Sequence, residues 1–233
     1  MWAAFHDESH MKKNALIVVA IVAVSVLTIA FYKVYDIHAT RARVIALLQD
    51  ANERLRPVLL SQATDSVGID IEAHAAIAEK HVVTLRDMKT ASVRRLADAA
   101  DDALVTNREI LRRHVDIGRA HARLTLNFES LAQHIKSDRG GNDWTREAVR
   151  LKALVDKDFR DYRIAVESYA SLLESFPATQ AKLAPYVEPA LLIDEKLVGN
   201  ARQQALDAYA GADQNIKRVG TLQAYRVGRA PAR

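Results

Sequence analysis

The sequence of 233 residues contains no cysteine, and only 8 glycines and 5 prolines. Without cysteine the chain can form neither disulfides nor the thiolate sites that bind zinc or iron–sulfur clusters. Glycine and proline together fall well below their usual share of roughly 12%. β-Sandwiches and barrels need more turn residues than this. Because 49% of the residues are hydrophobic, the chain can bury a core, and the composition indicates an all-helical protein.

The sequence also lacks the short motifs that mark common catalytic and nucleotide-binding sites. It has no nucleophile elbow, no phosphate-binding P-loop, no dinucleotide-binding glycine pattern and no His-Glu-x-x-His. The Glu-x-x-His pair of di-iron helical bundles is missing as well. We therefore expect neither an enzyme activity nor a resident cofactor. Nucleic-acid binding is not expected either, because residues 1–212 carry no net charge and aromatic residues are only 6%.

An apolar run without any charge is present instead, from residue 15 to residue 32. As a helix rising about 1.5 Å per residue, it would span roughly 27 Å, close to the thickness of a bilayer's hydrocarbon core. The lysines that flank it can extend to the headgroups; they are Lys12, Lys13 and Lys33. A cleaved signal peptide is the alternative, but the run is long for one and no small-residue cleavage pattern follows Phe31. The sequence thus predicts a single-pass transmembrane signal anchor over residues 13–33.

The lysine pair directly before the apolar run favours an N-terminus inside the cell and a C-terminal domain outside it, whereas Lys33, Arg41 and Arg43 on the other flank favour the reverse. In a bacterium this orientation corresponds to a single-pass inner-membrane protein with a periplasmic domain. The predicted organisation is a short tail over 1–12, the anchor over 13–33, a helical bundle over 34–212 and a basic C-terminal tail over 213–233. That tail carries a net charge of +4, which suits contact with anionic lipid or an acidic partner.

After the anchor, apolar residues recur at spacings of three and four, which predicts long amphipathic helices. The first would continue the transmembrane helix outward as a stalk, with Pro57 kinking or interrupting it and a break at 64–68. Residues 69–139 would form two helices joined near 97–103, where three aspartates favour a turn, or else one continuous coiled-coil helix.

The second half of the chain has clearer punctuation. A Gly-Gly-Asn-Asp turn would precede a helix over 144–176 that ends at Pro177. A connector, a helix over 189–209 and a last amphipathic piece capped by Asp213 would complete an antiparallel helical bundle or coiled-coil-like domain. On two of these helices the predicted core positions are Ala103, Asn107, Ile110, His114, Ile117, His121, Leu124, Phe128, Leu131 and Ile135, and Ala148, Leu151, Val155, Tyr162, Tyr169, Leu172 and Phe176.

Histidines are the one unusual chemical resource. They form two pairs spaced by seven residues, each on one helix face: His74 and His81, His114 and His121. A fold-back near residue 101 would set His81 against His121. A fold-back one turn earlier would set His74 against His121 and His81 against His114. Neutral imidazoles brought together can bind a metal or haem or respond to pH, so these four are the candidate metal ligands. The alternative is a polar layer that fixes the register of the helices.

The pattern as a whole indicates a non-catalytic interaction or scaffold protein anchored in the cell envelope, with the membrane and a protein partner or a second copy as its contacts. Two alternatives stay open. One is a sensory or ligand-binding bundle that works with a partner, and the other is a metal or haem binder that uses the histidines.

Overall fold

The computed structural model describes the backbone of residues 4–61, 70–137 and 141–227, with side chains from residue 21 to residue 220 of these ranges. Helices account for nearly all of this part of the chain, and it contains no strand. The long helices are α1 (Ala4–Leu60), α2 (Ile71–Asp87), α3 (Arg94–Lys136), α4 (Asn142–Leu183) and α5 (Glu195–Val227). Short 3-10 turns lie between them: η1 (Ala91–Val93), η2 (Ala184–Tyr186) and η3 (Pro189–Leu191). The predicted all-helical fold is confirmed.

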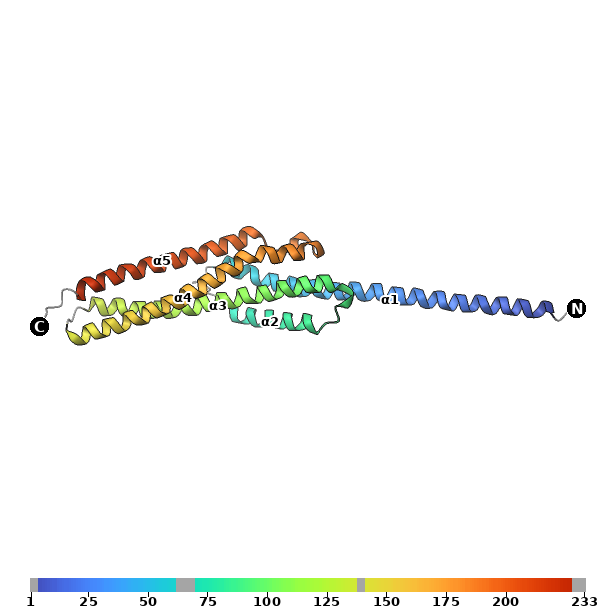
Figure 1. Cartoon of the computed structure of the whole chain (residues 1–233), viewed down its shortest axis with the longest axis horizontal. Helices are drawn as coiled ribbons and strands as arrows, with labels where there is room; N and C mark the ends of the chain where they lie inside the picture. Colours follow the sequence, from blue (N-terminus) through green and yellow to red (C-terminus); the bar gives the residue numbers. More distant parts are fainter. Residues whose placement is uncertain (1–3, 62–69, 138–140, 228–233) are drawn as a thin grey trace.

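The helices form an elongated, antiparallel bundle from which the N-terminal half of α1 projects (Figure 1). Helices α1, α3 and α5 run in one direction, and α2 and α4 run in the other. The start of α1 and the end of α5 therefore lie at opposite ends of the molecule. The predicted stalk is also present, because α1 continues without a break from the apolar run into the bundle.

The longest contact in the bundle joins α3 and α4. Gly141 precedes α4 with φ of 108°, a backbone conformation that favours glycine over any residue with a side chain. The rings of His134 in α3 and Trp144 in α4 stack with centroids 5.1 Å apart, and the Trp144 indole N–H donates to His134 O at 3.1 Å. The predicted break before this helix is confirmed, although Gly140 lies outside the described residues and α4 begins at Asn142, with Gly141 rather than Asn142 or Asp143 as its N-cap.

The connection between α2 and α3 lies at residues 88–93, so the predicted turn at 97–103 is wrong, and so is a single continuous helix. The segment chosen as a turn is instead an alanine-rich helical stretch, and alanine is the strongest helix former. Its alanines are buried, while two of its three aspartates reach cations on neighbouring helices. Asp101 accepts from Arg86 of α2 at 2.8 Å, and Asp102 accepts from Lys182 of α4 at 2.8 Å.

The helix end predicted at Pro177 is not observed, because α4 continues to Leu183, and Pro57 does not interrupt α1, which continues to Leu60. A proline inside a helix costs about 3 kcal/mol, mainly through a lost hydrogen bond. In α4 the next turn offsets this loss, because it carries Leu183, which is completely buried. Asp213 begins no new helix either; it lies inside α5 and pairs with Lys217.

The C-terminal part of α1 is a core element of the bundle. Val44, Leu48 and Leu55 are completely buried there, whereas Val34 and Ile37, which continue the same three-and-four spacing toward the N-terminus, are exposed. Nearly all the positions of α3 and α4 that were predicted to lie in the core are buried. The exceptions are His121, Phe128 and Leu172, which are half-buried. The core thus begins about one turn after residue 37 and extends along the whole length of α3.

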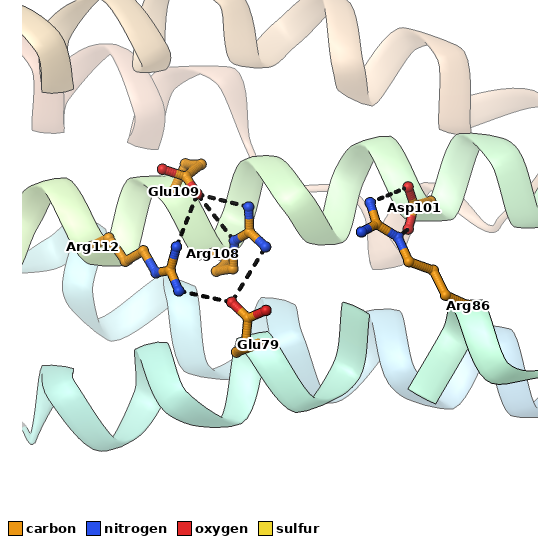
Figure 2. Close-up of polar contacts among 6 residues, drawn as sticks. All are labelled: Glu79, Arg86, Asp101, Arg108, Glu109 and Arg112. Atoms are coloured by element: carbon orange, nitrogen blue, oxygen red, sulfur yellow. Dashed lines mark hydrogen bonds and ion pairs between the residues drawn. The ribbon is translucent and has the colours of Figure 1, made fainter. Parts of the chain in front are cut away.

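A network of ion pairs fixes how α2 lies on α3 (Figure 2). Glu79 of α2 accepts from Arg112 at 2.8 Å and from Arg108 at 3.3 Å, while Glu109 bonds both arginines from their own helix. Near the C-terminal end of α2, the guanidinium of Arg86 donates one hydrogen bond to each carboxylate oxygen of Asp101. Such partly exposed pairs add little stability, and their main effect is to specify register.

Truncation of a core leucine tests whether α3 is buried as described. Leu111 is 1% exposed and Leu126, on the same helix, is 66% exposed. We expect Leu111→Ala to lower the free energy of unfolding by about 2–5 kcal/mol, because a cavity forms, and the matched Leu126→Ala to change it by less than about 0.5 kcal/mol. Thermal and denaturant unfolding of the full chain in detergent, followed by circular dichroism, measures both. Equal effects of the two variants would contradict the described packing.

Candidate functional site

Polar side chains cross the bundle where α1, α2, α3 and α4 meet, and we call this set the polar layer. Its members are Asp50, Asn52, Arg54, His74, His81, Asn107, His114 and Tyr169. Polar groups in a core are retained at a cost in stability, because each must be desolvated. The polar layer is therefore the first place to look for a function.

Two buried asparagines form its centre. Asn107 Nδ2 donates to Asn52 Oδ1 at 2.8 Å, and Asn52 Nδ2 donates to Leu191 O at 2.6 Å. The first bond joins α3 to α1 and the second joins α1 to the turn η3. A buried amide pair is satisfied in only one alignment of its helices, so it specifies register.

Further side chains of α1 hold the connector between α4 and α5. Arg56 donates to Ala190 O at 3.0 Å, and Arg41 donates to Tyr186 O at 3.0 Å. Together with the Asn52 bond, these contacts use backbone carbonyls that have no helical partner in the connector. The helix that carries the apolar run is thus bonded directly to the connector between the C-terminal end of α4 and the start of α5.

Asp50 is the charged member of the polar layer. The guanidinium of Arg54 bonds both of its oxygens, at 2.9 and 3.0 Å, and this holds the pKa of Asp50 below its usual value. His81 Nε2 lies 3.0 Å from the same carboxylate. Burial nevertheless lowers the pKa of His81, because desolvation outweighs the attraction of Asp50 and the nearby charge of Arg54 acts in the same direction as burial. At pH 7 this is therefore a close contact between a carboxylate and a neutral imidazole.

His114 is the most buried of the four candidate histidines, at 1% exposed. Its Nδ1 lies 3.4 Å from the hydroxyl of Tyr169, and its ring meets the tyrosine edge-on at a centroid distance of 5.6 Å. Desolvation lowers the pKa of His114 to about 4 and raises that of Tyr169. Its Nε2 is buried without a hydrogen-bond partner among the described residues.

The fold does not bring the four histidines together in either predicted way. Since the turn lies at 88–93, His121 contacts Tyr162 of α4 at a centroid distance of 5.5 Å rather than His81 or His74. Within each pair, seven residues separate the histidines by roughly 10 Å along the helix, too far for the bonds of about 2 Å that a metal requires. Among the residues that the structure describes, no group of three or more histidine, aspartate or glutamate side chains can hold a metal ion. The metal site stays a prediction.

Comparison of this chain with family models, curated proteins and solved structures finds no match. Its function must therefore be argued from its own geometry.

Sequence reasoning found the histidines and Asn107 but missed Asn52, Asp50 and the partner role of Tyr169. A signal for Asn52 exists, because it lies four residues after Leu48 and three before Leu55, which places it on the buried face of α1. What could not be seen is the register that sets Asn52 against Asn107 across 55 residues of chain.

Acid should destabilise the bundle through His114. Its pKa is about 4 when folded and 6.5 in the unfolded chain. Below pH 6.5 only the unfolded chain takes up the proton, so stability falls until the pH reaches the folded value. Between pH 7 and pH 5 this single group lowers the free energy of unfolding by about 2 kcal/mol. His81 and His121, whose pKa values are also lowered by burial, act in the same direction.

The variant His114→Gln keeps a polar side chain but cannot titrate, so its loss of stability between these pH values should be smaller by that amount. His38→Gln, at an exposed position of α1, is the matched control and should retain the wild-type slope. Denaturant unfolding at the two pH values measures the difference. An unchanged slope in His114→Gln would show that His114 is not buried as described.

Proposed function

We propose that this chain is a non-catalytic, membrane-anchored interaction protein that presents a rigid helical bundle to a helix of a protein partner outside the cytoplasm. The observation that carries the proposal is the continuity of α1, which is an exposed apolar helix over one half and a core helix of the bundle over the other.

Exposure of the first half supports the anchor. Every residue from 21 to 38 is exposed, including Leu27 at 69% and Phe31 at 78%. In the described part of the chain, α1 is the one helix long and apolar enough to cross a bilayer. Such a surface is unfavourable in water and is matched by lipid. The hydroxyls of Ser25 and Thr28 donate to carbonyls one turn back, at 2.8 Å each, which satisfies them in an apolar environment.

A hollow between α3 and α5 supports the partner helix. It has a volume of about 390 Å³ and lies beyond the level at which α1 ends. The side chains that line it are mostly apolar or small: His121, Leu124, Thr125, Phe128, Ala208, Gly211, Ala212, Asn215 and Ile216. Nearer the membrane, α1 contacts both of these helices. The hollow thus continues the position that α1 occupies, and another amphipathic helix is the ligand that its shape and apolar lining suit.

The outward orientation of the bundle is part of the proposal and rests on the lysine pair before the apolar run. Both parts can be tested together, because the chain has no cysteine and any introduced thiol is unique.

The test uses Thr125→Cys, at the hollow, and Ile164→Cys, which is 60% exposed on α4 and outside it. Intact cells are treated with a membrane-impermeant maleimide that carries a photo-crosslinking group, and lysed cells serve as the labelling control. We expect both thiols to react in intact cells. On illumination Thr125→Cys should give one discrete adduct, which a second substitution in the hollow, Phe128→Glu, abolishes, and Ile164→Cys should give none.

The outcomes separate the two parts of the proposal. Labelling only after lysis would contradict the orientation and leave the hollow to be tested with a permeant reagent. Labelling in intact cells with no adduct, or with the same adduct from both positions, would contradict a partner helix in the hollow.

A further inference from the structure

The end of the bundle from which α1 projects carries a hollow lined by arginines. It has a volume of about 380 Å³ and is formed by α1, the turn η1, the start of α3 and the turn η2. The side chains that matter for its chemistry are Ile37, Arg41, Ser92, Arg94, Arg95 and Tyr186. Both Arg94 and Arg95 are exposed, and Arg41 is held in place by its bond to Tyr186 O. None of these residues belongs to the polar layer or to the hollow between α3 and α5.

The position of this hollow relative to the apolar run follows from helix geometry. Arg41 comes nine residues after Tyr32, where the run ends, which is roughly 13 Å along the axis of α1. Ile37, on the same wall, is only about 7 Å from that point. The headgroup layer of a bilayer is about 5–8 Å thick on each side. The arginines therefore lie at, or within about one Debye length of, the headgroups.

Charge at this end of the bundle is predominantly positive. Residues 33–43 of α1 contain three basic residues and one acidic residue, and residues 86–95 contain four basic residues and one acidic residue. The nearby carboxylates neutralise only part of this charge. Asp101 binds Arg86, and Asp98 lies 3.9 Å from Arg94 in a contact where both side chains are largely exposed. The sequence between these two arginines adds Lys89 at an exposed position.

We propose that this surface binds the phosphate of anionic phospholipids in the leaflet from which α1 emerges. The proposal rests on the anchoring of α1 proposed above. Arginine forks match phosphate oxygens in geometry and charge, and the Ser92 hydroxyl can add a donor. Ile37 and Tyr186 provide an apolar wall of the kind found at membrane interfaces. Binding here docks the base of the bundle on the membrane and fixes the orientation of the whole rod.

The described part of the basic C-terminal segment, which the sequence suggested for this role, does not lie at this end. The chain enters the bundle at one end, and α5 runs toward the opposite end (Figure 1). Lys217 and Arg218 are therefore remote from the membrane that holds α1, and their removal is a matched control for loss of positive charge.

The experiment places the full chain in nanodiscs that contain equal amounts of phosphatidylglycerol and phosphatidylcholine. Native mass spectrometry then gives the ratio of the two lipids among those that stay bound to the protein. The variants compared are Arg94→Gln with Arg95→Gln, and Lys217→Gln with Arg218→Gln. We expect wild-type protein to retain mainly phosphatidylglycerol. The first double variant should lose about fivefold in enrichment for each arginine, and the second should match wild type.

Each alternative result has a distinct meaning. Equal retention of both lipids by wild type would overturn the lipid site while leaving the anchor intact, and so would equal losses in the two double variants. Enrichment that survives in the first double variant would also overturn it. Failure of the chain to enter nanodiscs at all would instead contradict the anchor, and with it the proposed function.

Discussion

Helix α1 has an exposed apolar surface over its first part and lies in the core of the bundle over its second part, and the rest of the structure depends on this arrangement. Over residues 21–38 every position of α1 is exposed, whereas Val44, Leu48 and Leu55 on the same helix are completely buried. A helix transmits position and rotation along its axis, so the bundle built on its second half cannot move independently of the first. The arrangement leaves no flexible linker between the apolar segment and the domain.

Two kinds of polar contact make α1 an integral part of the bundle. The bond between Asn52 and Asn107 aligns it with α3, and its arginines hold the connector between α4 and α5 by backbone carbonyls. The ion pairs around Glu79 play the same role for α2. None of these contacts contributes much to stability individually, because desolvation offsets much of the gain. Their value is specificity, since apolar helices alone can slide past one another.

The sequence predicted what depends on local pattern and missed what depends on register. The apolar run, the Gly-Gly turn and the core positions from Ala103 to Ile135 are visible in spacing alone. The turn between α2 and α3 was misplaced because its real site has no strong turn residue, while the aspartates that suggested another site are neutralised by Arg86 and Lys182 from distant segments. That error moved every expected histidine partner by several helical turns. With the turn at its real position, His114 contacts Tyr169 and His81 contacts Asp50, and neither contacts another histidine of the predicted pairs.

The continuity of α1 between lipid and core is the central claim, and a spin-label scan tests it directly. Single cysteines are introduced along residues 21–60 of the full chain in nanodiscs, and each label is measured for mobility and for collisions with oxygen and with a water-soluble relaxant. We predict preferential oxygen contact up to about Tyr32, then immobile labels at Val44, Leu48 and Leu55 with a helical period and no mobile stretch between the two regions. Highly mobile, water-exposed labels between residues 33 and 43 would show a hinge, and would contradict a rigid rod that joins membrane and bundle.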